Sequence, residues 1–139
     1  LLQEEHLLFS GDHIMQGSTV VIRPPDGDMA VYLDSLAKVQ ALRLKAIAPG
    51  HGHVIDDPGE VIAFYVSHRA EREEQLLEAL TAAGSATVEE LVATVYVDVD
   101  EERHPIAAHT VLAHLRKLSG EGKVTGDDLE SIESAWKPA

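Results

Sequence analysis

The sequence predicts a mixed α/β (α+β) protein in two parts, residues 1–83 and 84–139. In the first part, two short apolar runs end in glycine next to a carboxylate or a histidine, and a segment with helical spacing follows each of them. In the second part, two helical segments precede two strand-like ones. The 139 residues are 45% hydrophobic, which is enough for a buried core.

The first part alternates strands and helices. Its first strand should end at Phe9, just before Ser10-Gly11-Asp12, and the β-branched run Ser18–Ile22 predicts another strand. The prolines and glycine of 23–28 break the pattern, and a helix is expected from Met29 to about Leu44. A buried strand should follow at 46–48.

A long helix closes the first part. Asp57 has the position of an N-cap, Pro58 follows it, and Glu60 lies three residues after the cap. Apolar residues then recur at helical spacing to about Ala83. Gly84 ends the pattern, so we expect the boundary between the two parts there.

The second part begins with a capping box at Thr87–Glu90, which predicts a helix through Val95. A second helix should run from His104 to about Ser119, and strands are expected at 123–125 and 135–137. Helix, helix and hairpin is the order of a winged helix, and the run from His114 to Val124 strongly resembles one.

Two motifs in the first part carry candidate metal ligands. His51 lies in Pro49-Gly50-His51-Gly52 at the end of a strand, where flanking glycines leave the imidazole accessible. Asp12 follows the other strand, and its two oxygens are able to bridge two cations. The alternatives are an ordinary turn in which His51 only caps a neighbour and a turn aspartate that bonds its own backbone.

The long helix carries candidate substrate-binding residues near its middle. Arg69 and Arg72 have the forked geometry that orients an anionic group, and His68 precedes them. The competing interpretation, which the sequence favours, makes the arginines partners in surface or interdomain ion pairs. It likewise makes His68 a hydrogen-bonded histidine under a packed surface.

Charge bears on the partners of the winged helix. The sequence has 24 acidic and 11 basic residues, and 16 acidic against 7 basic from Gly59 onward. DNA would meet the second helix at His109, Thr110, His114 and Lys117. The expected wing, between the last two strands, carries four carboxylates that would repel phosphates: Asp127, Asp128, Glu130 and Glu133. DNA binding is therefore disfavoured and a packing or substrate-shaping role is preferred.

Ser10-Gly11-Asp12 and Pro49-Gly50-His51-Gly52, in this order and with the winged helix after them, resemble the C-terminal part of a metallo-β-lactamase superfamily hydrolase. The branch with a C-terminal winged helix, lactamase β 2, is the most similar. The resemblance implies the C-terminal half of an αββα sandwich, with Asp12 bridging two zinc ions and His51 binding the second. It also implies hydrolysis of an ester, thioester, lactam or phosphodiester by metal-activated water, with a small molecule or RNA as substrate.

One departure from the family is large. Its motif His-x-His-x-Asp-His is absent, and no cysteine offers a thiolate instead. We therefore expect this chain alone to be inactive and to need a missing N-terminal half or a second copy. No targeting or membrane segment is visible, so a cytoplasmic location is expected. A non-catalytic winged-helix interaction or nucleic-acid-binding module is the alternative.

Overall fold

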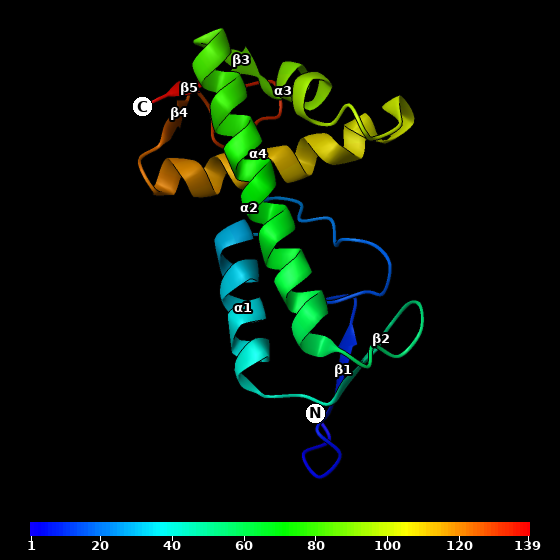
Figure 1. The fold of residues 1–139 in the computed structure, drawn as a ribbon. Helices are drawn as coiled ribbons and strands as arrows, with labels where there is room; N and C mark the ends of the chain where they lie inside the picture. The colour runs from blue at the N-terminus through cyan, green and yellow to red at the C-terminus, as the bar shows by residue number, and fades with distance from the viewer. The chain divides into compact units, whose positions relative to one another are not determined.

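The computed structural model describes residues 1–139, which form two compact units (Figure 1). The first unit comprises residues 1–20 and 31–69, and the second comprises 21–30 and 70–139. The domain boundary expected at Gly84 stays a prediction. None of the helices is both long and apolar enough to cross a membrane.

The first unit is built on two parallel strands, β1 (Leu7–Gly11) and β2 (Ala46–Pro49). Helix α1 (Met29–Ala41) lies in the connection between them, as a parallel pair requires, and α2 (Pro58–Ala83) follows β2. The register pairs Leu7 with Ala46 and Gly11 with Pro49, so both strands end at the same edge of the sheet.

The predicted helices are confirmed, with one difference in length. The backbone N–H of Glu60 donates to the Asp57 carboxylate over 3.0 Å, so Asp57 caps α2 as expected. Helix α1 ends at Ala41, three residues before the expected Leu44. Arg43 has a φ of 50°, a left-handed conformation that an α-helix cannot continue through.

The strand predicted at Ser18–Ile22 is wrong, because this segment has no regular secondary structure. Side chains from α2 bind its backbone instead: the Tyr65 hydroxyl donates to the Ser18 carbonyl and Arg69 donates to the Val20 carbonyl. The β-branched residues give a local preference for an extended chain, but no second strand pairs with it.

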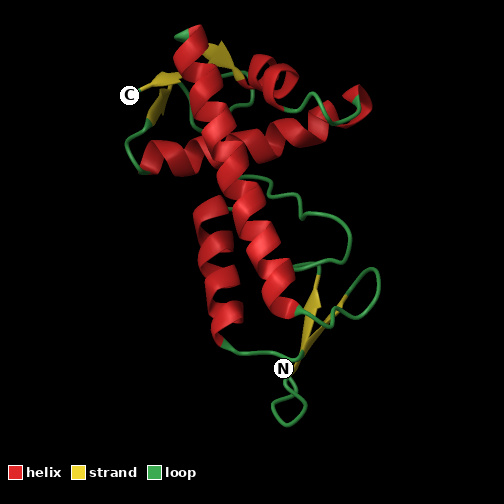
Figure 2. Ribbon diagram, in the orientation of Figure 1, coloured by secondary structure: helices red, strands yellow, loops and turns green.

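The second unit contains the winged helix (Figure 2). Its elements are β3 (Ala86–Thr87), α3 (Val88–Val95), the 3₁₀ turn η1 (Glu101–Arg103), α4 (His104–Gly120), β4 (Val124–Gly126) and β5 (Ala135–Pro138). The three strands are antiparallel in the order β3-β5-β4. The capping box at Thr87 and Glu90 is confirmed. Strand β3 and the 3₁₀ turn are too short to leave a periodic pattern in the sequence.

Trp136 lies at the centre of the second unit's core. It is fully buried on β5, in a cluster of apolar residues from α2, α3, α4 and the sheet. Gly126 faces its indole ring across the β4–β5 pair, and a Cβ at this position would lie 2.8 Å from three ring atoms. The wing therefore depends on a residue without a side chain at 126.

A partly buried ionic network joins α4 to the second half of α2. Glu73 accepts a hydrogen bond from Lys117 over 2.8 Å and lies 3.1 Å from Nδ1 of His114, which is fully buried. Lys117 also pairs with Glu121 over 2.7 Å. Burial alone would raise the pKa of Glu73, but its hydrogen bonds with His114 and Lys117 outweigh this and hold the pKa below its usual value.

We expect Gly126→Ala to lower the free energy of unfolding by about 1–3 kcal/mol, because the new methyl group must displace the Trp136 ring. Chemical denaturation followed by tryptophan fluorescence measures this directly. Gly120→Ala is the matched control, since nothing lies within 4 Å of its Cβ position in α4. Equal stability of the two variants would contradict the packing argument.

The lowered pKa of Glu73 predicts an acid-sensitive network. A carboxyl group with a lower pKa in the folded state adds stability above its unfolded pKa of about 4.5, and this stability is lost as the pH falls through the folded value. Between about pH 6 and pH 3, wild type should therefore lose more stability than Glu73→Gln. Thermal unfolding of both proteins across this range tests the difference, and parallel profiles would refute it.

Candidate functional site

The structure brings the two candidate metal ligands together. Asp12 follows β1 and His51 follows β2, and the shared strand edge places their side chains side by side. Nε2 of His51 lies 3.4 Å from Oδ1 of Asp12, and the two side chains are 74% and 71% exposed. Two exposed polar side chains on neighbouring loops thus lie side by side at the surface.

Neighbouring atoms approach the backbone on both sides of His51 so closely that glycine is required at positions 50 and 52. A Cβ on Gly50 would lie 2.8 Å from the Asp12 carboxylate and 3.2 Å from the backbone of Gly11. Gly52 has a φ of 91°, and a Cβ there would lie 2.8 Å from the side chain of Gln16. The Gly50 N–H also donates to the Gly11 carbonyl over 2.8 Å, so the two motif loops are in backbone contact.

The imidazole nitrogen of His51 and the carboxylate oxygen of Asp12 are both types of atom that bind zinc. Zinc binds imidazole nitrogen and carboxylate oxygen at about 2.0–2.2 Å, which places two tetrahedral ligand atoms about 3.4 Å apart. Asp12 and His51 have this separation. The chain groups no three His, Asp or Glu side chains in a metal-binding arrangement, so these two donors alone do not fill four positions.

Arg69 and His68 lie on the first unit's part of α2. Arg69 is 2% exposed, and its guanidinium group donates to the Val20 carbonyl and lies 5.8 Å from the ring centre of Tyr32. The ring of His68 stacks on Phe64 at 5.9 Å. The Arg69 guanidinium group is thus engaged within the protein, and the substrate-binding role of these two residues stays a prediction.

Arg72 belongs to the second unit. Its Nη2 contacts both oxygens of the Asp98 carboxylate, at 2.8 and 3.0 Å, and its Nη1 donates to the Val95 carbonyl over 2.8 Å. The guanidinium group also lies 4.5 Å from the centre of the Tyr96 ring. It therefore ties α2 to the end of α3, and its predicted contact with substrate stays untested.

The face of α4 that would read DNA is largely inaccessible. Thr110 is 6% exposed and His114 is fully buried. The Lys117 ammonium group is 15% exposed and paired with two carboxylates. Of the four candidate contacts, only His109 lines an open hollow. Thr110, His114 and Lys117 therefore pack within the unit instead of presenting a reading surface.

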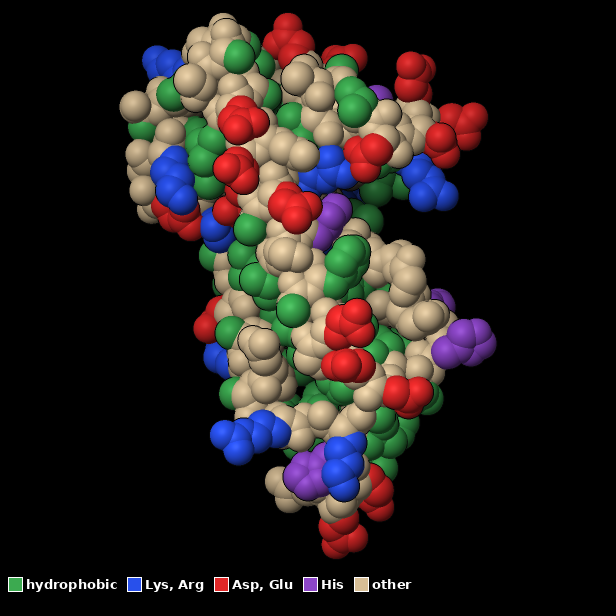
Figure 3. Space-filling model, in the orientation of Figure 1, with side chains coloured by type: hydrophobic (Ala, Val, Ile, Leu, Met, Phe, Trp, Pro, Cys, Tyr) green, Lys and Arg blue, Asp and Glu red, His purple; other side chains and the backbone are tan.

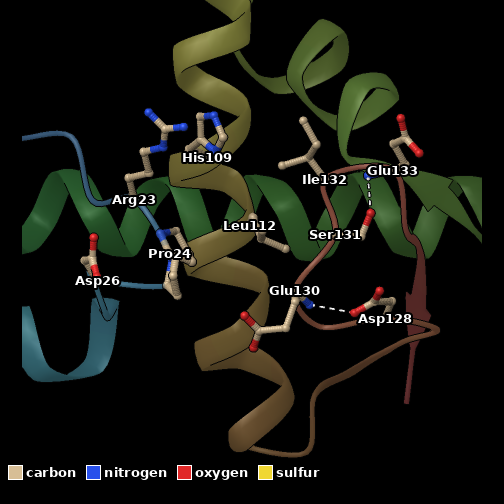
Figure 4. Close-up of a pocket in the computed structure, with 11 residues that line it drawn as sticks. Arg23, Pro24, Asp26, His109, Leu112, Asp128, Glu130, Ser131, Ile132 and Glu133 are labelled. Carbon is tan, nitrogen blue, oxygen red and sulfur yellow. Dashed lines mark hydrogen bonds between the residues drawn. The ribbon is translucent and has the colours of Figure 1, made fainter.

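The hollow beside His109 is acidic (Figure 4). It encloses about 630 Å³ between Arg23 and its neighbours on one side and α4 with the wing on the other. Asp26 and three wing residues line it with carboxylates, and Asp128 accepts a hydrogen bond from the Glu130 backbone. Figure 3 likewise shows Asp and Glu side chains scattered over the visible face without a large cluster of Lys and Arg.

Comparison with known proteins identifies the family. A family model described as "Beta-lactamase associated winged helix domain" matches residues 87–136. "Beta-lactamase-like protein 2 homolog" of Drosophila melanogaster is 36% identical over 126 residues, which cover 89% of this chain and 42% of that protein. A crystal structure of a metallo-beta-lactamase family protein from Thermus thermophilus covers 99% of this chain with a TM-score of 0.81 at 23% identity. The chain belongs to the metallo-β-lactamase-like family.

The match is to part of each metallo-β-lactamase-like relative. The chain covers 44% of the Thermus structure, and it spans less than half the length of the curated relatives described here. Another relative is "Atrochrysone carboxyl ACP thioesterase AacuM" of Aspergillus aculeatus, which is 33% identical over 135 residues that cover 89% of this chain and 42% of that protein. The predicted correspondence to the C-terminal part of the family, with its winged helix, is confirmed.

Sequence patterns selected Asp12 and His51 because each follows a strand within a short glycine-containing motif. They gave no role to Tyr32 and Tyr65, whose hydroxyl groups bind the backbone after Asp12. Hydrogen bonds between a side chain and a distant carbonyl have no fixed spacing, so no periodic signal marks them. The helical spacing of apolar residues indicated only that the two tyrosines lie on the buried faces of their helices.

We expect Gly50→Ala to separate Asp12 from His51 and to lower stability by about 1–3 kcal/mol, because its methyl group would overlap the carboxylate and the Gly11 backbone. Thermal unfolding measures the stability change. Gly59→Ala is the control, since its Cβ would meet only Asp57, at an ordinary 3.5 Å. A Gly50 variant as stable as this control would show that the loops tolerate a wider separation.

Proposed function

We propose that this chain supplies two ligands, Asp12 and His51, to a zinc-dependent hydrolase of the metallo-β-lactamase-like family. The observation that carries the proposal is the 3.4 Å separation of Nε2 and Oδ1, which fits two ligands of one tetrahedral zinc ion. Asp12 and His51 would hold the metal through a carboxylate oxygen and an imidazole nitrogen. The high exposure of both side chains leaves room for further ligands.

Bound zinc would lower the pKa of a coordinated water to about 7 and polarise the bond that the water attacks. Within this chain, Asp12 and His51 would hold the ion, and the glycines beside His51 let the neighbouring loop approach closely. We favour a thioester or ester substrate, since the Aspergillus aculeatus relative, whose match covers 89% of this chain, is described as a thioesterase. The remaining ligands would come from another chain or segment, so the isolated chain should not turn over substrate.

The alternative, a winged helix that binds nucleic acid, has less support. Thr110 and His114 are buried, and the hollow beside the wing is lined by carboxylates. Phosphate contacts provide most of the non-specific affinity for a duplex, and this surface offers few cations for them. We propose a packing or substrate-shaping role for the module.

Elemental analysis of the purified chain after dialysis against zinc tests the proposal. Wild type should bind more zinc than either Asp12→Ala or His51→Ala, because two donors hold the ion better than one. His53→Ala is the matched control, since it removes an exposed histidine from the same loop. Zinc content that stays at the wild-type level in both Asp12→Ala and His51→Ala would overturn the assignment of the two ligands.

A further inference from the structure

The segment that follows Asp12 is held by the side chains of two helices. Residues 13–20 contain no helix or strand, so their backbone groups have no ladder partners. Ile14, in the middle of the segment, is fully buried and anchors it in the first unit. The conformation of this segment therefore depends on hydrogen bonds from outside it.

Tyr65 on α2 makes the largest share of these bonds. Its single O–H proton is shared between the carbonyls of Met15, at 2.9 Å, and Ser18, and its oxygen accepts the Met15 N–H over 3.1 Å. The residue is 1% exposed, and burial raises the pKa of the hydroxyl group, which keeps it protonated as a donor. One phenol thus fixes the backbone at two places in the segment.

Tyr32 and Arg69 hold the two ends. The Tyr32 hydroxyl donates to the His13 carbonyl over 3.0 Å, one residue after Asp12. Arg69 donates to the Val20 carbonyl and lies over the Tyr32 ring at 5.8 Å. Burial raises the pKa of Tyr32 to about 12, so this hydroxyl group also remains a donor.

The segment in turn touches the loop of His51. The Gln16 side chain fills the space in front of Gly52, where a Cβ would lie 2.8 Å from it. At the other end, Gly11 accepts the Gly50 N–H. The Asp12 carboxylate is exposed and contacts His51, so its position follows from the backbone on either side of it.

We propose that Tyr65 is a positioning residue, which acts with Tyr32 and Arg69 as a clamp on residues 13–20 and so sets the separation of Asp12 and His51. The inference deepens the proposed metal site and rests on it for its functional meaning. The clamp itself is independent of any bound ion, because all of its contacts are between protein groups.

Tyr65→Phe in the full chain tests the clamp, since it removes the hydroxyl group and keeps the buried ring. The first measurement is amide hydrogen exchange by NMR, read at two amides beside the proposed ligands. The Gly50 N–H donates to the Gly11 carbonyl, and the His13 N–H donates to the Ser10 carbonyl. We expect both amides to exchange about tenfold faster than in wild type, while Leu36 in the middle of α1 exchanges at the wild-type rate. Ser67→Ala is the matched control, because it removes a hydroxyl group of α2 that bonds only the helix backbone.

The second measurement is zinc affinity by calorimetry below the unfolding transition. The variant should bind zinc about tenfold more weakly, as expected when support for a metal ligand is removed, and the Ser67 control should match wild type. Unchanged exchange at Gly50 and His13, or faster exchange that includes Leu36 equally, would overturn the clamp. Selective exchange together with zinc content that is insensitive to Asp12→Ala and His51→Ala would retain the clamp and refute the proposed function instead.

Discussion

The candidate site depends on the close approach of the turns that follow β1 and β2. The hydrogen bond from the Gly50 N–H to the Gly11 carbonyl holds these two turns together. A parallel strand pair brings the turns to the same edge of the sheet, but strand pairing alone leaves their side chains free to diverge. Contact between the backbones removes that freedom. Both ligands are then oriented by main-chain geometry, although their side chains are largely in solvent.

Helix α2 supports both compact units with residues that lie one turn apart. Arg69 binds the segment after Asp12, whereas Arg72 binds Asp98 and the end of α3. Each guanidinium group donates to a backbone carbonyl, that of Val20 for Arg69 and that of Val95 for Arg72. Arginine suits this task because its charge persists at any accessible pH and its forked donors reach two acceptors.

Much of the fold and the proximity of Asp12 and His51 were predictable from the sequence. The caps at Asp57 and Thr87 and the helical spacing after them predicted α2 and α3, and the two glycine motifs predicted that Asp12 and His51 belong to one site. The error at Ser18–Ile22 has a physical cause: strand propensity describes a residue's local preference, whereas a strand needs a partner. The burial of polar residues on α4 could not be predicted from local sequence either, because it depends on Glu73, which lies 41 residues before His114.

The inward polar face of α4 also limits what the winged helix can become. A module that reads DNA changes its specificity through exposed residues of this helix, and substitutions there leave the fold intact. In this chain Thr110 and His114 are part of the interior, so a change at either is first a change in packing. New binding properties are more easily acquired through the wing, where residues 127–133 face solvent and local turns hold the backbone.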